Sequence, residues 1–523
     1  MNKSSFKSYS FPTETPPSGT GGPLFLKTPP SGAGGPKTPL RGAWGLLFFI
    51  FLFNSCTEKF DEMNVDPNNP TKISAQYLLP YALERSIDRY WGGRDRFERL
   101  NLDGAMLWMQ YLTRNIYSNE GDNYGISPAM QNNNWLGFFN DGLVNYQRII
   151  SISEAKGIAP NTNYEGVALV MRSWLFSVMT DTWGAIPYND ALKGTADAPN
   201  YTPNYDSQEK VYEGLLNDLK IANEKLSVTG PAIQGDIVFS GNILRWKRFA
   251  NSLRLRLANR QAAKKPAESR AIMREILGDA AKFPIITANA DNAIVRNTTV
   301  LPSNNEWHQV LIQESRTDWN ISSTLADKMN AMSDTRITIY ANPVGGKYTG
   351  HPNGLPDAIA TTFLATSSTV GNYFTVPSAP SVLMTASEVN LILAEAFLDG
   401  DITTGTAKGY FEAGMTTSFE QFGLTVPAGY FTRVGDATRT KVLEQKWLAL
   451  YGVGVEAWTE YRRTGLPVLP AKDPRAVFEN DGILPTRLPY PGSEYSLNKA
   501  ALDKGIALNG GADNMKTKLW WAE

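Results

Sequence analysis

The stretch "TASEVNLILAEAF" (Thr385–Phe397) carries the clearest structural signal in the chain. Thr385 and Glu388 have the spacing of a capping box, in which two side chains satisfy the free backbone amides at a helix start. Apolar residues then recur every three or four positions, which is typical of a helix with one buried face. These apolar residues are Val389, Ile392, Leu393, Ala396 and Phe397. Such a helix cannot bury its apolar face alone, so we expect it to pack against others.

Further stripes with the same period occur along much of the chain. They lie in 167–178, 211–226, 246–257 and 443–450. The first helix should end near Trp183-Gly184, ahead of Pro187. Paired amphipathic helices of this kind stack, as in helical-repeat proteins. No strict 34-residue period is visible, so any repeat is degenerate. The pattern predicts a mostly α fold.

Three long polar and aromatic stretches separate the predicted helices, at 113–135, 287–320 and 341–380. They are too long for ordinary connections in a compact domain. We expect them to be folded loops that carry function, with a few short strands. No linker composition interrupts 57–523, so this part is predicted to be one domain.

The N-terminal part contains "LLFFIFLFNSC" (Leu46–Cys56), which ends on the only cysteine of the 523 residues. Its apolar core of 8 residues is too short for a membrane span, which needs about 20. With Lys37 and Arg41 before it, the segment matches a secretory signal. Its end resembles the lipobox of bacterial lipoproteins, in which Cys56 would be acylated; the alternative is a lone buried thiol.

The predicted domain boundaries follow from this segment. Residues 1–55 are expected to be a disordered prefix rich in proline and glycine, followed by the lipoprotein signal. The mature domain would comprise residues 56–523, with residues 56–72 as the tether to the lipid anchor.

Composition excludes several functions. The formal net charge is −1, with no basic excess, which argues against nucleic acid as a partner. The single cysteine excludes a disulfide framework and thiolate metal sites. The two histidines, His308 and His351, have no metal-ligand spacing and are expected to be loop or surface residues. We therefore predict no metal and no cofactor.

The sequence contains no enzyme motif in the structural context that the motif requires. The run Gly452–Ala457 formally matches G-x-G-x-x-A, but it follows a helical pattern where a dinucleotide site needs a strand. The carboxylates single out no acid/base pair. A glycosidase would look no different in this respect, so a surface-anchored hydrolase of glycans or peptides remains the alternative.

Four stretches, taken in order, resemble the SusD/RagB family of outer-membrane nutrient-binding lipoproteins, in particular its RagB-like "SusD-like" branch. The resemblance covers nearly all of 56–523. The stretches are "MTDTWGAIPYNDAL" (Met179–Leu192), "SEVNLILAEA" (Ser387–Ala396), "GVEAWTEYRRTGLPVL" (Gly454–Leu469) and "LPTRLPYPGSEYSLN" (Leu484–Asn498).

The resemblance implies a scaffold of four tetratricopeptide-like helix pairs with irregular loops on the other side. It also implies a partner: family members sit at the cell surface as a lid over a TonB-dependent outer-membrane transporter and hand it glycans or peptides. The acidic residues Glu58, Asp61 and Glu62 resemble the surface-export signal of such lipoproteins, here interrupted by Lys59 and Phe60.

The most distinctive motif residues are expected to be structural. Glu456, Arg462 and Arg463 lie around Trp458, and arginine's planar fork suits a buried ion pair. Trp183, Pro187 and Tyr188 should form a helix-terminating turn that packs on the scaffold.

A ligand site for sugars or extended peptides needs exposed aromatic faces beside fixed hydrogen-bonding groups. Three loops offer that mixture: "RYWGGRDRF" (Arg89–Phe97), "RNIYSNEGDNYG" (Arg114–Gly125) and "ESRTDWN" (Glu314–Asn320). The alternative is that each aromatic ring covers the core beneath its loop. The predicted ligand-binding residues are Tyr90, Trp91, Arg94, Asn115, Tyr117, Asp122, Tyr124, Trp319 and Asn320.

The sequence thus predicts a non-catalytic, lipid-anchored surface protein. It would capture an oligosaccharide or peptide and deliver it, as a lid, to a TonB-dependent transporter. Besides the hydrolase, a structural lipoprotein that only braces its partner is a further alternative.

Overall fold

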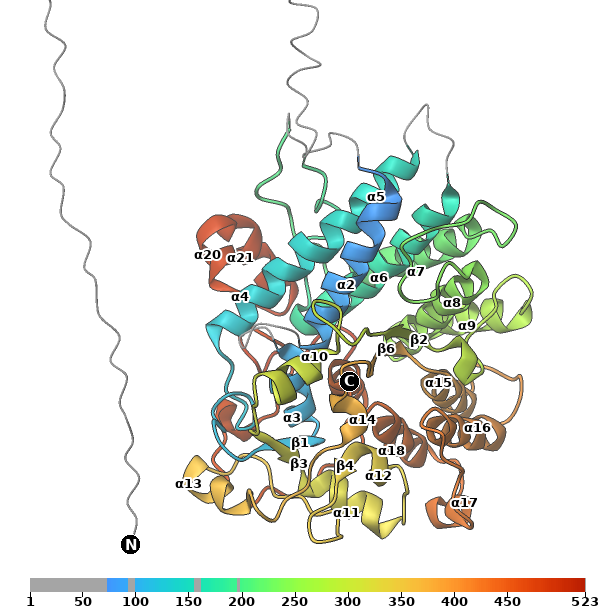
Figure 1. Cartoon of the computed structure of the whole chain (residues 1–523). Coiled ribbons are helices and arrows are strands. Elements are labelled where there is room, and N and C mark those ends of the chain that lie inside the picture. The colour runs from blue at the N-terminus through green and yellow to red at the C-terminus, as the bar shows by residue number, and fades with distance from the viewer. Residues whose placement is uncertain (1–72, 93–98, 155–160, 195–197, 523) are drawn as a thin grey trace, which may run out of the picture. The chain divides into compact units, whose positions relative to one another are not determined.

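Long helices that pack against one another in chain order form the scaffold (Figure 1). The computed structural model describes residues 73–92, 99–154, 161–194 and 198–522. The signal segment, Cys56, the tether and Arg94 lie outside these residues. The scaffold helices are α2 (Ala75–Trp91), α5 (Val144–Glu154), α6 (Thr162–Trp183), α7 (Gln208–Lys225), α8 (Ile243–Arg260), α9 (Pro266–Gly278), α15 (Ala386–Leu398), α16 (Ala407–Glu420), α18 (Arg439–Ala449) and α19 (Gly454–Thr464).

These helices form four pairs, α2 with α5, α6 with α7, α8 with α9, and α15 with α16. Contacts of α5 with α6, α7 with α8, and α8 with α15 join each pair to the next. In Figure 1, α5 to α9 follow one another from the upper centre toward the right, and α15, α16 and α18 lie below them. The predicted scaffold of tetratricopeptide-like helix pairs is therefore confirmed.

The helix termini follow from local sequence. Helix α6 ends at Trp183, as predicted, and Gly184 caps it with φ 87°. At the start of α15, Thr385 Oγ1 accepts a hydrogen bond from the Glu388 backbone N–H at 3.2 Å. The reciprocal half of the predicted capping box does not form, because the Glu388 carboxylate binds the guanidinium of Arg256 at 2.6 Å.

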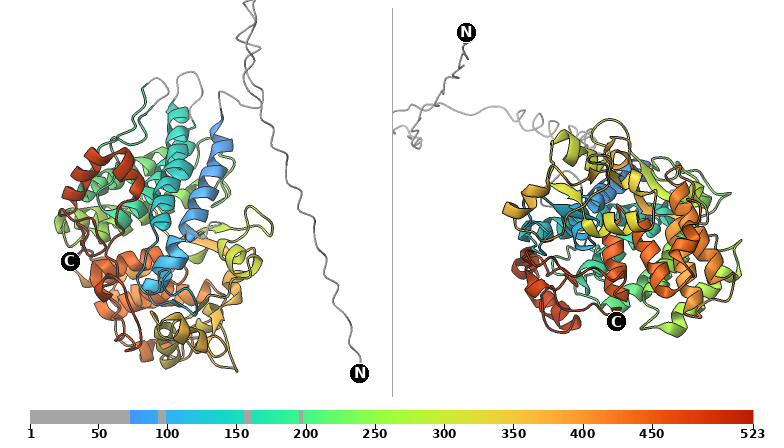
Figure 2. Two further views of the ribbon diagram at one scale, coloured as in Figure 1. Left: turned by 90° about the vertical axis from the view of Figure 1, so that its left-hand side faces the viewer. Right: turned by 90° about the horizontal axis from the view of Figure 1, so that it is seen from below.

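The chain leaves the scaffold after α9 and returns to it at α15. The intervening residues 279–385 hold short elements and loops (Figure 2). Two earlier segments, between α2 and α5 and between α6 and α7, also hold short elements or loops. The short helices here and elsewhere in the described chain are α3 (Met106–Trp108), α4 (Pro128–Gly137), α10 (Glu306–His308), α11 (Ser323–Ala331), α12 (Ile337–Tyr340), α13 (Asp357–Ala360), α14 (Asn372–Thr375), α17 (Tyr430–Val434), α20 (Gly492–Leu497) and α21 (Lys499–Leu508). The π-helical and 3₁₀ turns are η1 (Leu100–Ala105), η2 (Phe138–Leu143), η3 (Asn289–Asp291), η4 (Gln309–Gln313), η5 (Thr361–Phe363) and η6 (Asn480–Gly482).

The predicted loops do contain short strands. An antiparallel four-stranded sheet has the order β1-β3-β5-β4, and β2 pairs with β6 in a second ribbon. The strands are β1 (Leu112–Arg114), β2 (Ala293–Arg296), β3 (Trp319–Ile321), β4 (Ala341–Asn342), β5 (Thr369–Val370) and β6 (Pro380–Met384). The expectation of a loop throughout 113–135 was wrong at its end, because Ser127 Oγ caps α4 by accepting from the Met130 N–H at 3.0 Å.

Candidate functional site

Two of the three predicted ligand loops lie side by side because strand β1 pairs with strand β3. The register aligns Leu112 with Ile321 and Arg114 with Trp319. The loop that follows β1 thereby meets the loop that precedes β3, about 200 residues further along the chain. Figure 1 shows the two strands in contact below α3.

A buried ion cluster holds the two loops together. The Arg114 guanidinium contacts Asp318 at 3.0 Å, Asp103 at 3.1 Å and Glu120 at 3.2 Å. It also lies 4.4 Å from the centroid of the Trp319 ring. Burial raises the pKa of Asp103, although Arg114 opposes that shift. Arg114, Asp103 and Asp318 are buried and paired, so they position the loops rather than contact a ligand.

Tyr117 and the mostly covered Arg316 lie above this cluster. The Tyr117 side chain is 40% exposed, and its backbone has φ 58°, in the left-handed region. The Arg316 guanidinium lies 5.7 Å from the Tyr117 ring and 5.4 Å from the Trp319 ring. Its Nε also donates to Asp318 Oδ2 at 2.9 Å, which fixes its position. We call this pair, with Glu314, the Tyr117 surface.

Glu314 connects the Tyr117 surface to Arg99, which lies just beyond the first predicted loop. The Arg99 Nη2 contacts Glu314 Oε2 at 3.0 Å, and the Glu314 side chain is 41% exposed. Arg99 directly follows residues 93–98, which the structure does not describe. Sequence reasoning missed both Arg99 and Glu314, because neither is aromatic and their pairing spans 215 positions.

Amide and carboxylate side chains support the loops from beneath. Asn115 Nδ2 donates to Thr317 O and to Asn320 Oδ1, both at 2.7 Å. Asp122 accepts four hydrogen bonds, including those from the Gly354 N–H at 2.9 Å and Asn353 Nδ2 at 2.6 Å. Burial raises the pKa of Asp122 to about 6, against the lowering effect of these bonds. Asn115, Asp122 and Asn320 are all buried, so they order the loops and do not reach solvent.

Several predicted ligand-binding aromatics are core residues in the structure. Trp91 is fully buried, donates from Nε1 to Val382 O at 3.0 Å, and packs against Trp307 at 5.5 Å. Tyr90 packs edge-on against Trp174. A ring without an exposed face cannot stack on a ligand, so Tyr90 and Trp91 do not fit the role expected of them. They belong to the last turn of α2 rather than to a loop.

The remaining predicted aromatics are also covered. Trp319 lies beneath Arg114 and Arg316. Tyr124 is buried and stacks on Phe478 at 4.5 Å, with Lys472 Nζ 4.9 Å from the Phe478 ring. Among the described candidates, Tyr117 alone presents substantial aromatic surface. Arg94 is outside the described residues.

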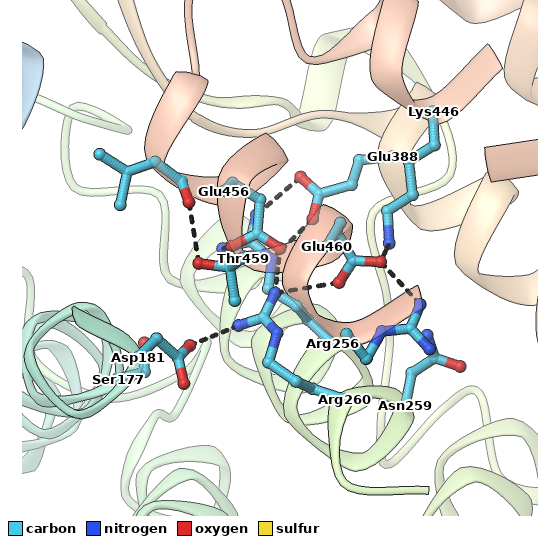
Figure 3. Close-up of polar contacts among 12 residues, drawn as sticks. Ser177, Asp181, Arg256, Asn259, Arg260, Glu388, Lys446, Glu456, Thr459 and Glu460 are labelled. Carbon is cyan, nitrogen blue, oxygen red and sulfur yellow. Dashed lines mark hydrogen bonds and ion pairs between the residues drawn. The ribbon is translucent and has the colours of Figure 1, made fainter. Parts of the chain in front are cut away.

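The motif charges form a buried network that joins five helices, α6, α8, α15, α18 and α19 (Figure 3). Arg260 binds Asp181 at 2.8 Å, Glu460 at 3.3 Å and, more closely, Glu456. Arg256 binds Glu388, and Lys446 contacts Glu460 at 2.9 Å. The prediction that Glu456 is structural is confirmed. Its principal partner is Arg260, which the motif itself does not contain.

The two arginines of that motif have separate roles. Arg463 binds Glu395 at 2.8 Å and Glu460 at 2.7 Å. Arg462 lies 3.4 Å from the Trp458 ring centroid and donates to backbone carbonyls, including Thr486 O at 3.0 Å. Burial lowers the pKa of Arg462 to about 9.

The turn after α6 is packed as predicted. Trp183 Nε1 donates to Pro489 O at 3.2 Å, and the Tyr188 hydroxyl donates to Asp218 Oδ2 at 2.9 Å.

The two histidines differ in environment. His308 Nδ1 lies 2.8 Å from Thr375 O. His351 is fully buried between Ser367 and Arg114, so the expectation of a loop or surface residue was wrong about its exposure. Within the described part of the chain, no group of three or more His, Cys, Asp or Glu side chains is arranged to hold a metal ion.

Among the helices of the described residues, none combines the length and apolar character that crossing a bilayer requires.

The fold and the Tyr117 surface define a helical-repeat protein that carries polar and aromatic groups on rigidly held loops. The chain belongs to the SusD-like family: the family model described as "Starch-binding associating with outer membrane" matches residues 67–491. No curated protein matches the sequence.

Solved structures share the fold. A chitin-binding protein has a TM-score of 0.75 at 24% identity, over 86% of this chain and 100% of that one. A chitin-binding SusD homologue from Flavobacterium johnsoniae has a TM-score of 0.74 at 24% identity, over 85% and 98%. A SusD homologue from Bacteroides uniformis has a TM-score of 0.72 at 25% identity, over 86% and 98%.

Proposed function

We propose that this chain is a non-catalytic glycan-binding lipoprotein of the outer membrane, anchored through Cys56. It would capture an oligosaccharide on the Tyr117 surface and deliver it, as a lid, to a TonB-dependent transporter. The observation that carries the proposal is the exposed Tyr117 ring beside Arg316, mounted on the buried Arg114 cluster. The family's description and the two chitin-binding relatives support glycan over peptide.

The geometry suits a sugar for three reasons. An aromatic face gives contact area at little entropic cost, since tyrosine has few rotatable bonds. Arg316 and Glu314 are charged groups that hydroxyls can bind more strongly than they bind neutral partners. Both are already held by protein contacts, Arg316 by Asp318 and Glu314 by Arg99, so little ordering is needed on binding.

Titration calorimetry with maltotetraose and N-acetylchitotetraose tests the site. Replacing Tyr117 by Ala should weaken binding about fivefold, because the ring contact contributes about 1 kcal/mol. Tyr201→Ala is the matched control: this tyrosine is 81% exposed and lies outside the surface. Equal affinities for the two variants would refute the assignment. If the protein bound members of a peptide library and neither sugar, the ligand would be a peptide and not a glycan.

The hydrolase alternative is tested on the same sample. Mass spectrometry of the sugars after prolonged incubation should recover them unchanged. Shortened products that persist after repurification of the protein would show turnover and overturn the non-catalytic assignment.

The partner is tested by co-purification. The wild-type chain should isolate with a TonB-dependent transporter from detergent-solubilised outer membranes. Isolation without any such barrel, under conditions that retain other lipoprotein complexes, would contradict the lid role and favour a protein that acts alone.

A further inference from the structure

A cavity of about 510 Å³ lies away from the Tyr117 surface. Its lining comes from the β2–β6 ribbon, from α14 and from the end of α16. In Figure 1 this region lies apart from the β1–β3 pair, and the two sites share no residue. The lining residues that matter here are Asn289, Arg296, Asn297, Tyr373, Glu420 and Gln421.

Tyr373 forms a fixed aromatic wall of this cavity. Its ring packs edge-on against Phe374 at 5.1 Å and against Phe422 at 5.2 Å. The tyrosine itself is only partly buried. Both supporting rings also line a small adjoining cavity of about 50 Å³, which extends the apolar wall inward. A ring held in this way can accept the apolar face of a sugar without first being ordered.

Two asparagines present amide groups in fixed orientations. Asn297 Nδ2 donates to Ala379 O at 2.7 Å and to Ser381 Oγ at 2.8 Å, which occupies its donor end. Asn289 Nδ2 donates to Thr417 O at 3.0 Å. Each amide is thus pinned by its nitrogen, and the Asn297 oxygen is left to accept a hydrogen bond.

Three further polar side chains are uncommitted. Arg296, Glu420 and Gln421 make no side-chain hydrogen bond or ion pair with any residue in the described ranges. One positive and one negative side chain leave the cavity with no net charge. A charged ligand would be repelled by whichever of the two side chains has the same sign. Hydroxyl groups, in contrast, can donate to Glu420 and accept from Arg296.

We infer that this cavity is a second glycan site, which binds a sugar unit of a neutral oligosaccharide against Tyr373. Arg296, Glu420 and Gln421 supply the hydrogen bonds to its hydroxyl groups. The inference rests on a separate set of residues and does not require the Tyr117 surface to bind.

Hydrogen–deuterium exchange of the full chain in mild detergent, with maltotriose or N-acetylchitotriose at millimolar concentration, locates the binding. We expect protection of peptides that cover 289–297 and 417–422, in the wild type and equally in Tyr117→Ala. No protection there with either sugar overturns the second site, whatever happens at 114–120. Protection at 114–120 reports separately on the proposed function.

A double variant tests the residues. In the Tyr117→Ala background, Arg296→Ala/Gln421→Ala should weaken the remaining sugar binding about tenfold in saturation-transfer NMR, the effect of one or two lost hydrogen bonds. The control, Gln131→Ala/Arg148→Ala in the same background, makes the same chemical changes on α4 and α5 and should leave the sugar affinity unchanged. Equal loss in both double variants, or in neither, overturns the assignment.

Discussion

His351 supports the strand that carries the Tyr117 loop, and its protonation should weaken the fold. Its Nε2 donates to Arg114 O at 3.2 Å, and its Nδ1 accepts from Ser367 Oγ at 3.1 Å. The ring also stacks on Phe363 at 5.2 Å. The Arg114 carbonyl can only accept, so it places a proton on Nε2, and Ser367 Oγ can then donate to the unprotonated Nδ1 of a neutral imidazole. Burial lowers the pKa of His351 from 6.5 to about 4, although the bond to Arg114 opposes the shift.

The sign of the pH effect follows from the two pKa values. Between pH 6.5 and 4 the unfolded chain binds a proton at this position and the folded chain does not, so acidification favours unfolding. The stabilisation is complete above pH 6.5 and is lost as the pH falls to 4. The pKa difference corresponds to about 3.4 kcal/mol at 1.36 kcal/mol per pKa unit.

Urea unfolding followed by tryptophan fluorescence, from pH 7 to pH 4, measures this contribution. His351→Gln should be less stable than the wild type at pH 7 by about 1–2 kcal/mol, because its hydrogen bonds fit less well. Between pH 7 and pH 4, the free energy of unfolding of this variant should fall by about 3 kcal/mol less than that of the wild type, since glutamine does not titrate. His308→Gln is the control for replacing a histidine elsewhere. Parallel stability profiles for the wild type and His351→Gln would refute the reasoning.

Three further outcomes are expected. Arg260→Met should lower the free energy of unfolding by about 3–5 kcal/mol in urea denaturation, because Asp181 and Glu456 would remain buried without their shared cation. Gly121→Ala should lower it by about 2 kcal/mol or more in the same assay: its φ is 102°, and an added Cβ would lie 1.7 Å from Asp103 O. Cys56→Ala should abolish metabolic labelling with a fatty acid and release the protein from the membrane fraction, since acyl chains would be its anchor.

The scaffold could be predicted because each helix carries its own signal. The apolar stripe and Thr385 define α15 locally, and Gly184 ends α6 where the sequence indicates. The same kind of local signal indicates that Trp91 belongs to helix α2 and not to the predicted ligand site. Gly92, with φ 96°, is the C-cap of α2, so the residues before it continue the buried face of that helix.

The site could not be predicted in the same way because it depends on pairing between distant segments. Arg114 and Asp318 are 204 positions apart, and nothing local distinguishes their pairing from many other pairings of opposite charge. Only the alignment of β1 with β3 brings them together. Once the two strands are paired, ion pairs and ring contacts within the protein engage most of the charged groups and aromatic faces of both loops.

Substitutions at the buried and at the exposed groups of these loops should affect binding differently. Arg114 and Asp122 are buried and hold the loops, whereas the Tyr117 side chain is partly exposed beside Arg316. Surface substitutions away from buried networks usually change stability by less than about 0.5 kcal/mol. Changes at Tyr117 should therefore alter ligand preference at little cost in stability. Changes at Arg114 should reduce stability and binding together, because its guanidinium pairs with Glu120 of one loop and Asp318 of the other.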